Sequence, residues 1–147
     1  MQLLLLMSKE LLLGTVMGIQ GYFDWKRREI PLSVSVIGGV AGIIFCICEH
    51  RRINEIMVAS AFGIVMLVFA KITNQVIGYG DGVTMLMLGL FLPVESLLSM
   101  SLLAFGLAGA YALILLVVFH GKRNTQIPFI PFLTIANGIR CFTEVML

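Results

Sequence analysis

Six runs of apolar residues, separated by short polar or charged stretches, occupy most of the chain. They cover residues 3–23, 32–48, 56–72, 83–93, 96–119 and 129–147. A regular alternation of apolar and polar residues, which would indicate membrane β-strands, is absent. Runs of about 20 apolar residues can cross a bilayer as helices. The pattern therefore predicts an all-α fold, a polytopic membrane helical bundle with about six transmembrane helices, in a single domain over residues 1–147.

The fourth run is shorter than the others. As a helix, residues 83–93 would extend roughly 16 Å, about half of a hydrocarbon core near 30 Å thick. Either the helix continues beyond Pro93, or it is a short helix in a thinned or water-accessible region. The second arrangement would place Asp81 nearer the membrane interior than an ordinary loop residue.

Composition agrees with a membrane protein. The chain is 59% hydrophobic and 12% charged, and its mean hydropathy is +1.03, whereas about a quarter of the residues in a soluble domain are charged. The net charge of +2 is small, and the basic residues form short clusters at the ends of apolar runs, which is typical of membrane topology. We therefore expect contact with membrane lipids and no nucleic-acid partner.

The basic residues predict which loops share a side of the membrane. If the first loop is cytoplasmic, six basic residues fall on that side: Lys26, Arg27, Arg28, Lys71, Lys122 and Arg123. The opposite loops hold two, Arg51 and Arg52. This excess favours an outer location for both termini. The same count places Asp24 and Asp81, the two aspartates of the chain, at one membrane face.

Two carboxylates at one face suggest general acid/base chemistry. One carboxylate would take a proton from water while the other donates a proton to a peptide carbonyl or leaving nitrogen. At close range, like-charge repulsion keeps one of the two protonated. Gly78, Gly80 and Gly82 surround Asp81 and would permit backbone geometry that side chains forbid. The alternative is a glycine turn in which Asp81 is an ordinary N-cap of the fourth helix.

Small residues spaced four apart predict close helix packing within the bundle. Three such pairs occur: Gly14 with Gly18, Gly38 with Gly42, and Gly106 with Ala110.

Three short motifs, in this order, resemble those of the type IV prepilin peptidases, which belong to the GxGD class of membrane aspartic peptidases. They are Asp24 with Ile30-Pro31 after the first helix, Gly78-Tyr79-Gly80-Asp81 at the start of the fourth, and Ile127-Pro128-Phe129-Ile130-Pro131-Phe132 at the start of the sixth. The resemblance covers essentially the whole chain. It implies a membrane-embedded peptidase with Asp24 and Asp81 as the catalytic pair. The supporting positions that it implies are Ile30, Pro31, Gly78, Tyr79, Gly80, Gly82, Pro128 and Pro131.

The resemblance also implies a substrate and a location. The substrate would be a pilin-like precursor whose basic leader is cleaved at the cytoplasmic face of a prokaryotic cell membrane, while its apolar helix stays in the bilayer. Larger members of the family have a cytoplasmic loop with paired cysteines and also methylate the new N-terminus. This chain has no such loop, so methyl transfer is not expected, and the short form is similar to the Tad-type and archaeal preflagellin peptidases.

Two positions depart from the family pattern. Ile130 stands where many relatives have a small residue, which bears on the packing of the sixth helix. Gly82 follows the second aspartate where a bulkier apolar residue is usual, which would loosen the start of the fourth helix.

Three other interpretations remain open. Residues 76–81 resemble the potassium-channel filter, whose carbonyl groups replace the hydration shell of an ion, although Val76 stands at the threonine position and the filter interpretation leaves Asp24 unexplained. A presenilin-like peptidase shares GxGD, but Phe23 precedes Asp24 where that group has tyrosine. A catalytically silent assembly protein of the same fold is the third.

Histidine and cysteine residues form no metal-binding pattern. His50 and His120 are isolated at the ends of apolar runs, and Cys46, Cys48 and Cys141 lack the paired spacing of a structural zinc site. The sequence therefore predicts no metal and no cofactor.

Overall fold

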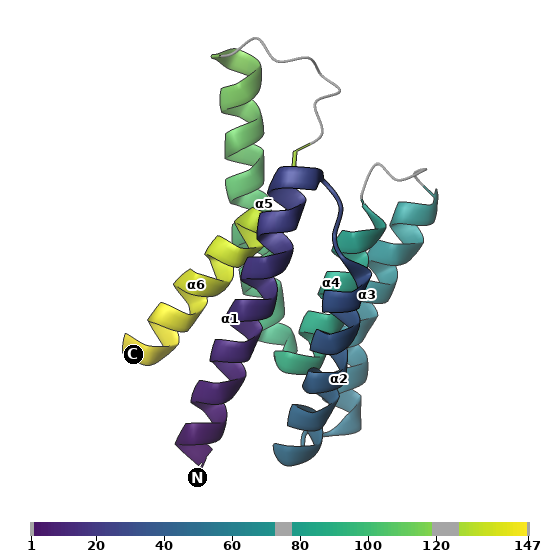
Figure 1. The fold of residues 1–147 in the computed structure, drawn as a ribbon, viewed down its shortest axis with the longest axis vertical. Helices are drawn as coiled ribbons and strands as arrows, with labels where there is room; N and C mark the ends of the chain where they lie inside the picture. Colours follow the sequence, from purple (N-terminus) through teal and green to yellow (C-terminus); the bar gives the residue numbers. More distant parts are fainter. Residues whose placement is uncertain (1, 73–77, 119–126, 147) are drawn as a thin grey trace.

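A computed structural model describes residues 2–72, 78–118 and 127–146, and all regular secondary structure in these ranges is α-helical. The helices are α1 (Gln2–Arg27), α2 (Leu32–Cys48), α3 (Ile53–Ile72), α4 (Tyr79–Phe91), α5 (Val94–Val117) and α6 (Ile130–Met146) (Figure 1). The predicted all-α membrane bundle is confirmed. By length and composition, α1, α3 and α5 can each cross a membrane, and α2 is a shorter apolar helix.

The fourth helix is short because it ends before Pro93. α4 has 13 residues, so it extends about 20 Å, less than the roughly 30 Å of a hydrocarbon core. Pro93 stands at the N-cap position of α5 in extended conformation, where its missing N–H costs no helical hydrogen bond. The helix therefore does not continue beyond Pro93, and it begins at Tyr79, earlier than the apolar run predicts.

Exposure on α2 is the reverse of that in a soluble protein. Its buried residues are Ser35, Gly38, Gly42 and Cys46, all small. Its exposed residues include β-branched apolar side chains at positions 36, 37, 40, 43, 44 and 47. This distribution suits a helix surrounded by lipid, where association depends on close packing of small residues rather than on hiding apolar surface from water.

Glycines hold α4 tightly against α3. A Cβ at Gly63 would overlap the backbone of Leu86, and a Cβ at Gly89 would lie 2.8 Å from the Ala59 carbonyl oxygen. Backbones this close leave no room for a side chain on either residue. α4 is therefore seated on α3 along its length.

The prediction from paired small residues is confirmed for α2 and wrong elsewhere. A Cβ at Gly38 would collide with Met87 of α4, and one at Gly42 would lie 2.8 Å from Leu90 Cβ. In contrast, nothing lies within 4 Å of a Cβ built at Gly14, Gly18 or Gly106. These positions are on faces of α1 and α5 that no described neighbour covers.

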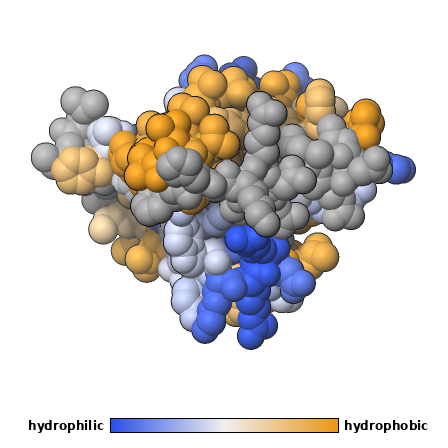
Figure 2. All heavy atoms as spheres, turned by 90° about the horizontal axis from the view of Figure 1, so that it is seen from above, coloured by the Kyte–Doolittle hydropathy of each residue, from blue (hydrophilic) through white to orange (hydrophobic). Residues whose placement is uncertain are grey.

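Both aspartates lie at the same end of the bundle, as the charge count predicts. The end of α1 and the starts of α4 and α6 lie in the upper half of Figure 1, below the C-terminal end of α5, with the α2–α3 connection at the opposite end of the bundle. Figure 2, which looks onto this end, shows hydrophilic residues gathered on one side and hydrophobic residues over much of the rest. Lys122 and Arg123, which contribute to the charge count, lie outside the described residues.

Ionic contacts close the opposite end. Lys9 of α1 forms a salt bridge with Glu49 (2.6 Å), after α2. Arg51 donates to the carbonyl oxygens of Leu90 (2.8 Å) and Leu92 (3.0 Å), which α4 leaves without helical partners at its C-terminus. The α2–α3 connection is thus fastened to α1 and α4.

We predict that Gly63→Ala lowers the free energy of unfolding by about 1–3 kcal/mol, the usual cost of overpacking, because the new methyl group meets backbone that no side-chain rotation can move. Thermal unfolding in detergent measures this.

Gly39→Ala is the matched control, since nothing lies within 4 Å of a Cβ at Gly39. Its stability should be unchanged or slightly higher. Equal losses for the two variants would contradict the backbone contact between α3 and α4.

Candidate active site

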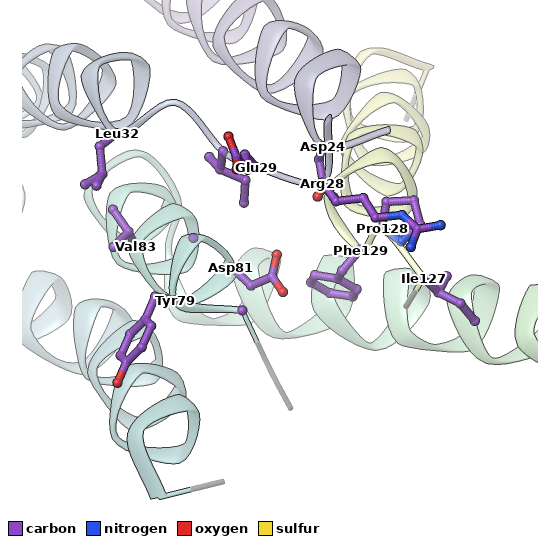
Figure 3. Close-up of a pocket in the computed structure, with 13 residues that line it drawn as sticks. Asp24, Arg28, Glu29, Leu32, Tyr79, Asp81, Val83, Ile127, Pro128 and Phe129 are labelled. Atoms are coloured by element: carbon purple, nitrogen blue, oxygen red, sulfur yellow. The ribbon is translucent and has the colours of Figure 1, made fainter. Parts of the chain in front are cut away.

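A cavity of about 600 Å³ opens at the end of the bundle where the two aspartates lie (Figure 3). Its walls are the end of α1, the α1–α2 connection, the first turn of α4 and the segment before α6. Of the predicted site residues, the lining includes Asp24, Ile30, Gly78, Tyr79, Gly80, Asp81 and Pro128. The lining does not include the other three predicted residues, Pro31, Gly82 and Pro131. The cavity is in the size range of sites for small ligands or short peptide segments.

Asp24 lies in the last turn of α1 and is 7% exposed. Its Oδ2 accepts a hydrogen bond from the backbone N–H of Ile130 (3.0 Å), and the Phe129 N–H also interacts with this carboxyl. Both N–H groups lie at the start of α6, and neither has another acceptor among the described residues. Asp24 therefore acts as an N-cap for a helix more than a hundred residues away in sequence.

The prolines of the last motif explain why these two N–H groups meet Asp24. Pro128 and Pro131 have no N–H, so Phe129 and Ile130 are the donors that the start of α6 offers. A helix N-terminus also carries partial positive charge, which favours a carboxylate there. The role of the motif in this fold is thus to present two donors to Asp24.

Close packing of α6 on α1 sets this contact. A Cβ at Gly21 would lie 2.9 Å from Thr134 Oγ1 and 3.5 Å from Pro131 Cα. The Thr134 hydroxyl is within hydrogen-bond distance of the Met17 carbonyl oxygen (3.1 Å). The sequence analysis did not single out Gly21 or Thr134, because a glycine and a threonine inside apolar runs carry no distinctive signal.

The chain turns sharply after Arg27, the last residue of α1. Arg28 is left-handed (φ 54°), and its N–H donates to the Asp24 carbonyl oxygen (2.9 Å), an arrangement that commonly ends helices. Arg28 and Glu29 both line the cavity, and the charge of Arg28 acts on Asp24. Neither residue was assigned to the predicted site.

Asp81 is the third residue of α4, and its carboxyl points into the cavity (Figure 3). The N-cap position belongs to Gly78, so the N-cap alternative for Asp81 is wrong. The Asp81 carboxyl turns back and interacts with the Gly78 N–H, and the charge of Asp24 acts on it across the cavity. The two carboxyls thus face one space and influence each other.

The glycines around Asp81 are required for contact rather than for unusual backbone angles. No glycine in the described residues has positive φ. A Cβ at Gly80 would lie 2.9 Å from Ile30 Cβ, and a Cβ at Gly82 would lie 3.0 Å from the Leu67 backbone nitrogen. Gly80 therefore accepts the α1–α2 connection, and Gly82 fixes the start of α4 on α3 instead of loosening it.

The potassium-filter alternative is not favoured by this geometry. Tyr79 and Gly80 are in helical conformation, and the Gly78 carbonyl oxygen accepts the Asp81 N–H (3.1 Å). A filter needs extended backbone with its carbonyl groups free to face an ion. Among the residues described, no three His, Cys, Asp or Glu side chains are grouped as a metal site requires.

Comparison with known protein families gives one match. The model of the type IV leader peptidase family matches residues 11–114, a range that includes both aspartates and ends before Pro128. Comparisons with curated proteins and with solved structures give no match.

We predict that Gly80→Ala displaces the α1–α2 connection, because the added methyl group occupies the space of the Ile30 side chain. The free energy of unfolding should fall by about 1–3 kcal/mol, as measured by thermal unfolding in detergent.

The double variant Gly80→Ala/Ile30→Ala should recover part of that loss, because it removes the colliding side chain. If the double variant loses more free energy of unfolding than the two single variants lose together, the Ile30–Gly80 contact is not what prevents a side chain at position 80.

Proposed function

The chain belongs to the type IV leader peptidase family, and on this premise we propose that it is a membrane aspartic endopeptidase that removes the basic leader of pilin-like precursors. Asp24 and Asp81 are its catalytic residues in this proposal. The observation that carries it is the convergence of two carboxyls, from α1 and α4, on one cavity at an end of the bundle. The two are the only aspartates in the chain.

The partners of each carboxyl suggest a division of roles. The ionised form of Asp24 is supported by the N–H groups of Phe129 and Ile130 and by the charge of Arg28. Within the described part of the chain, Asp81 has one N–H partner, that of Gly78, and it faces the negative charge of Asp24. Like-charge repulsion then leaves the shared proton on the carboxyl with fewer partners. Asp24 is accordingly the base and Asp81 the acid.

Hydrolysis follows the usual acid/base course for such a pair. Asp24 removes a proton from a water molecule while the water oxygen attacks the scissile carbonyl carbon. Asp81 gives its proton to the carbonyl oxygen. Collapse of the tetrahedral intermediate breaks the C–N bond, the proton held by Asp24 passes to the leaving nitrogen, and a hydroxyl group of the intermediate returns a proton to Asp81. The products are the free leader and a mature chain with a new amino terminus.

The surroundings of the cavity support a cytoplasmic orientation. Lys26 and Arg27 are exposed beside it at the end of α1, and Lys71 ends α3 on the same side. Basic residues of this kind mark the cytoplasmic face. The precursor's apolar helix would stay in the bilayer while its leader enters the cavity from this side, where Glu29 offers a negative charge.

We predict that Asp24→Asn and Asp81→Asn each abolish leader removal, a fall of about 10²–10⁴-fold or more. The assay co-reconstitutes the purified protein in proteoliposomes with a pilin-like precursor that has a Lys/Arg-rich leader before an apolar helix, and follows cleavage by mass spectrometry. Asparagine keeps a side-chain oxygen that can accept the Ile130 N–H, so both variants should fold.

Thermal unfolding in detergent is the control for folding. If the wild type cleaves the precursor and either folded variant cleaves it equally well, Asp24 and Asp81 are not a catalytic pair. A wild-type protein that binds the precursor without cutting it would instead favour the catalytically silent assembly protein.

A further inference from the structure

Three polar side chains are buried beneath the cavity, between α1, α2 and α4. Gln20 and Thr84 are 0% exposed and Ser35 is 3% exposed. Gln20 Nε2 donates to Ser35 Oγ (2.7 Å), which joins α1 to α2. Burying polar side chains in an apolar bundle costs free energy unless each forms hydrogen bonds. The presence of these three side chains together therefore requires an explanation.

The packing of α2 on α4 brings Thr84 to the level of Ser35. The two helices run in the same direction (Figure 1). Gly38 meets Met87, and Gly42 meets both Leu90 and Phe91. That register, continued one turn toward the cavity, places Ser35 at the level of Val83 and Thr84.

Two atoms of this group have no partner among the described residues, Gln20 Oε1 and Thr84 Oγ1. They are chemically complementary, because an amide oxygen only accepts a hydrogen bond and a threonine hydroxyl can donate one. Leaving both unpaired inside the bundle costs more than joining them.

The group lies directly under the two carboxyls. Gln20 precedes Asp24 by four residues on α1, and Thr84 follows Asp81 by three on α4, so each pair shares a helix face one turn apart. The two helices pack mainly on different neighbours: α1 packs most closely on α6, and α4 on α3 and α2. The separation of the carboxyls therefore depends on whatever joins α1 to α4 near this level.

We propose that Gln20 and Thr84 are positioning residues for the proposed hydrolysis. The Thr84 hydroxyl donates to one buried water, which donates in turn to the Gln20 amide oxygen, and this link sets the spacing of α1 and α4 from which Asp24 and Asp81 project. The inference rests on the proposed function, and it adds two residues that touch neither substrate nor water nucleophile.

Thr84→Val tests the link, because valine has the shape of threonine without the hydroxyl. We expect kcat for leader removal to fall about 10- to 100-fold, as for a small misplacement of reacting groups, with KM unchanged. Thermal stability should fall modestly, because the link loses one of its buried hydrogen bonds. Thr84→Ser should keep a near wild-type kcat. Gln20→Met should give a similar loss, and the double variant should be no slower than either single variant.

Ser60→Ala is the matched control. Ser60 on α3 also has a buried hydroxyl without a partner among the described residues, and its removal should change neither kcat nor stability. A wild-type kcat in Thr84→Val, with wild-type protein active and Asp81→Asn inactive, overturns the positioning role alone. Absence of cleavage by the wild type overturns the proposed function.

A second measurement does not depend on cleavage. Spin labels at Trp25→Cys and Tyr79→Cys, in a background with Cys46, Cys48 and Cys141 replaced by serine, report the distance between the ends of α1 and α4. Thr84→Val should broaden or lengthen that distance relative to Ser60→Ala. Identical distance distributions would overturn the link between the helices.

Discussion

The hydrogen bond between Asp24 and the backbone of Ile130 is the contact on which the end of the bundle depends. In an apolar interior, the first N–H groups of α6 have no water to bind, so they need a protein acceptor. Asp24 supplies it, and the carboxyl is fixed in return. The same interaction therefore stabilises the start of a helix and orients a reactive group, and the segment before α6 becomes a wall of the cavity because it is held there.

The bundle consists of two tightly packed parts joined by α2. α4 is seated on α3 through Gly63, Gly82 and Gly89, with backbones in contact. α6 is seated on α1, where Gly21 accepts Thr134 and Pro131. One carboxyl belongs to each part. α2 bridges them, and the contact of Ile30 with Gly80 brings the end of α1 to the start of α4. The cavity thus lies between the part formed by α1 and α6 and the part formed by α3 and α4.

Apolar run length and loop charge predict much of this fold. They predict six helices, the short fourth helix and the shared end of Asp24 and Asp81. They do not predict that α1 continues to Arg27 or that α4 begins at Tyr79, because charged residues and glycines can extend a helix when tertiary contacts hold them. Gly80 and Gly82 were assigned to backbone freedom, whereas each has a neighbour, Ile30 or Leu67, that only the folded chain brings near. Gln20, Ser35 and Thr84 were missed since isolated polar residues in apolar runs have no periodic signature.

The short α4 has a consequence for the depth of the site. A helix of about 20 Å is shorter than a hydrocarbon core of roughly 30 Å, and no residue from Asp81 to Leu92 is exposed on the surface of the bundle. Neighbouring helices therefore surround α4, and its length does not have to match the thickness of the bilayer. Its N-terminus opens on the cavity, the setting in which a helix start is tolerated at membrane depth. Asp81 thus has a route to water through the protein, without requiring the membrane to thin.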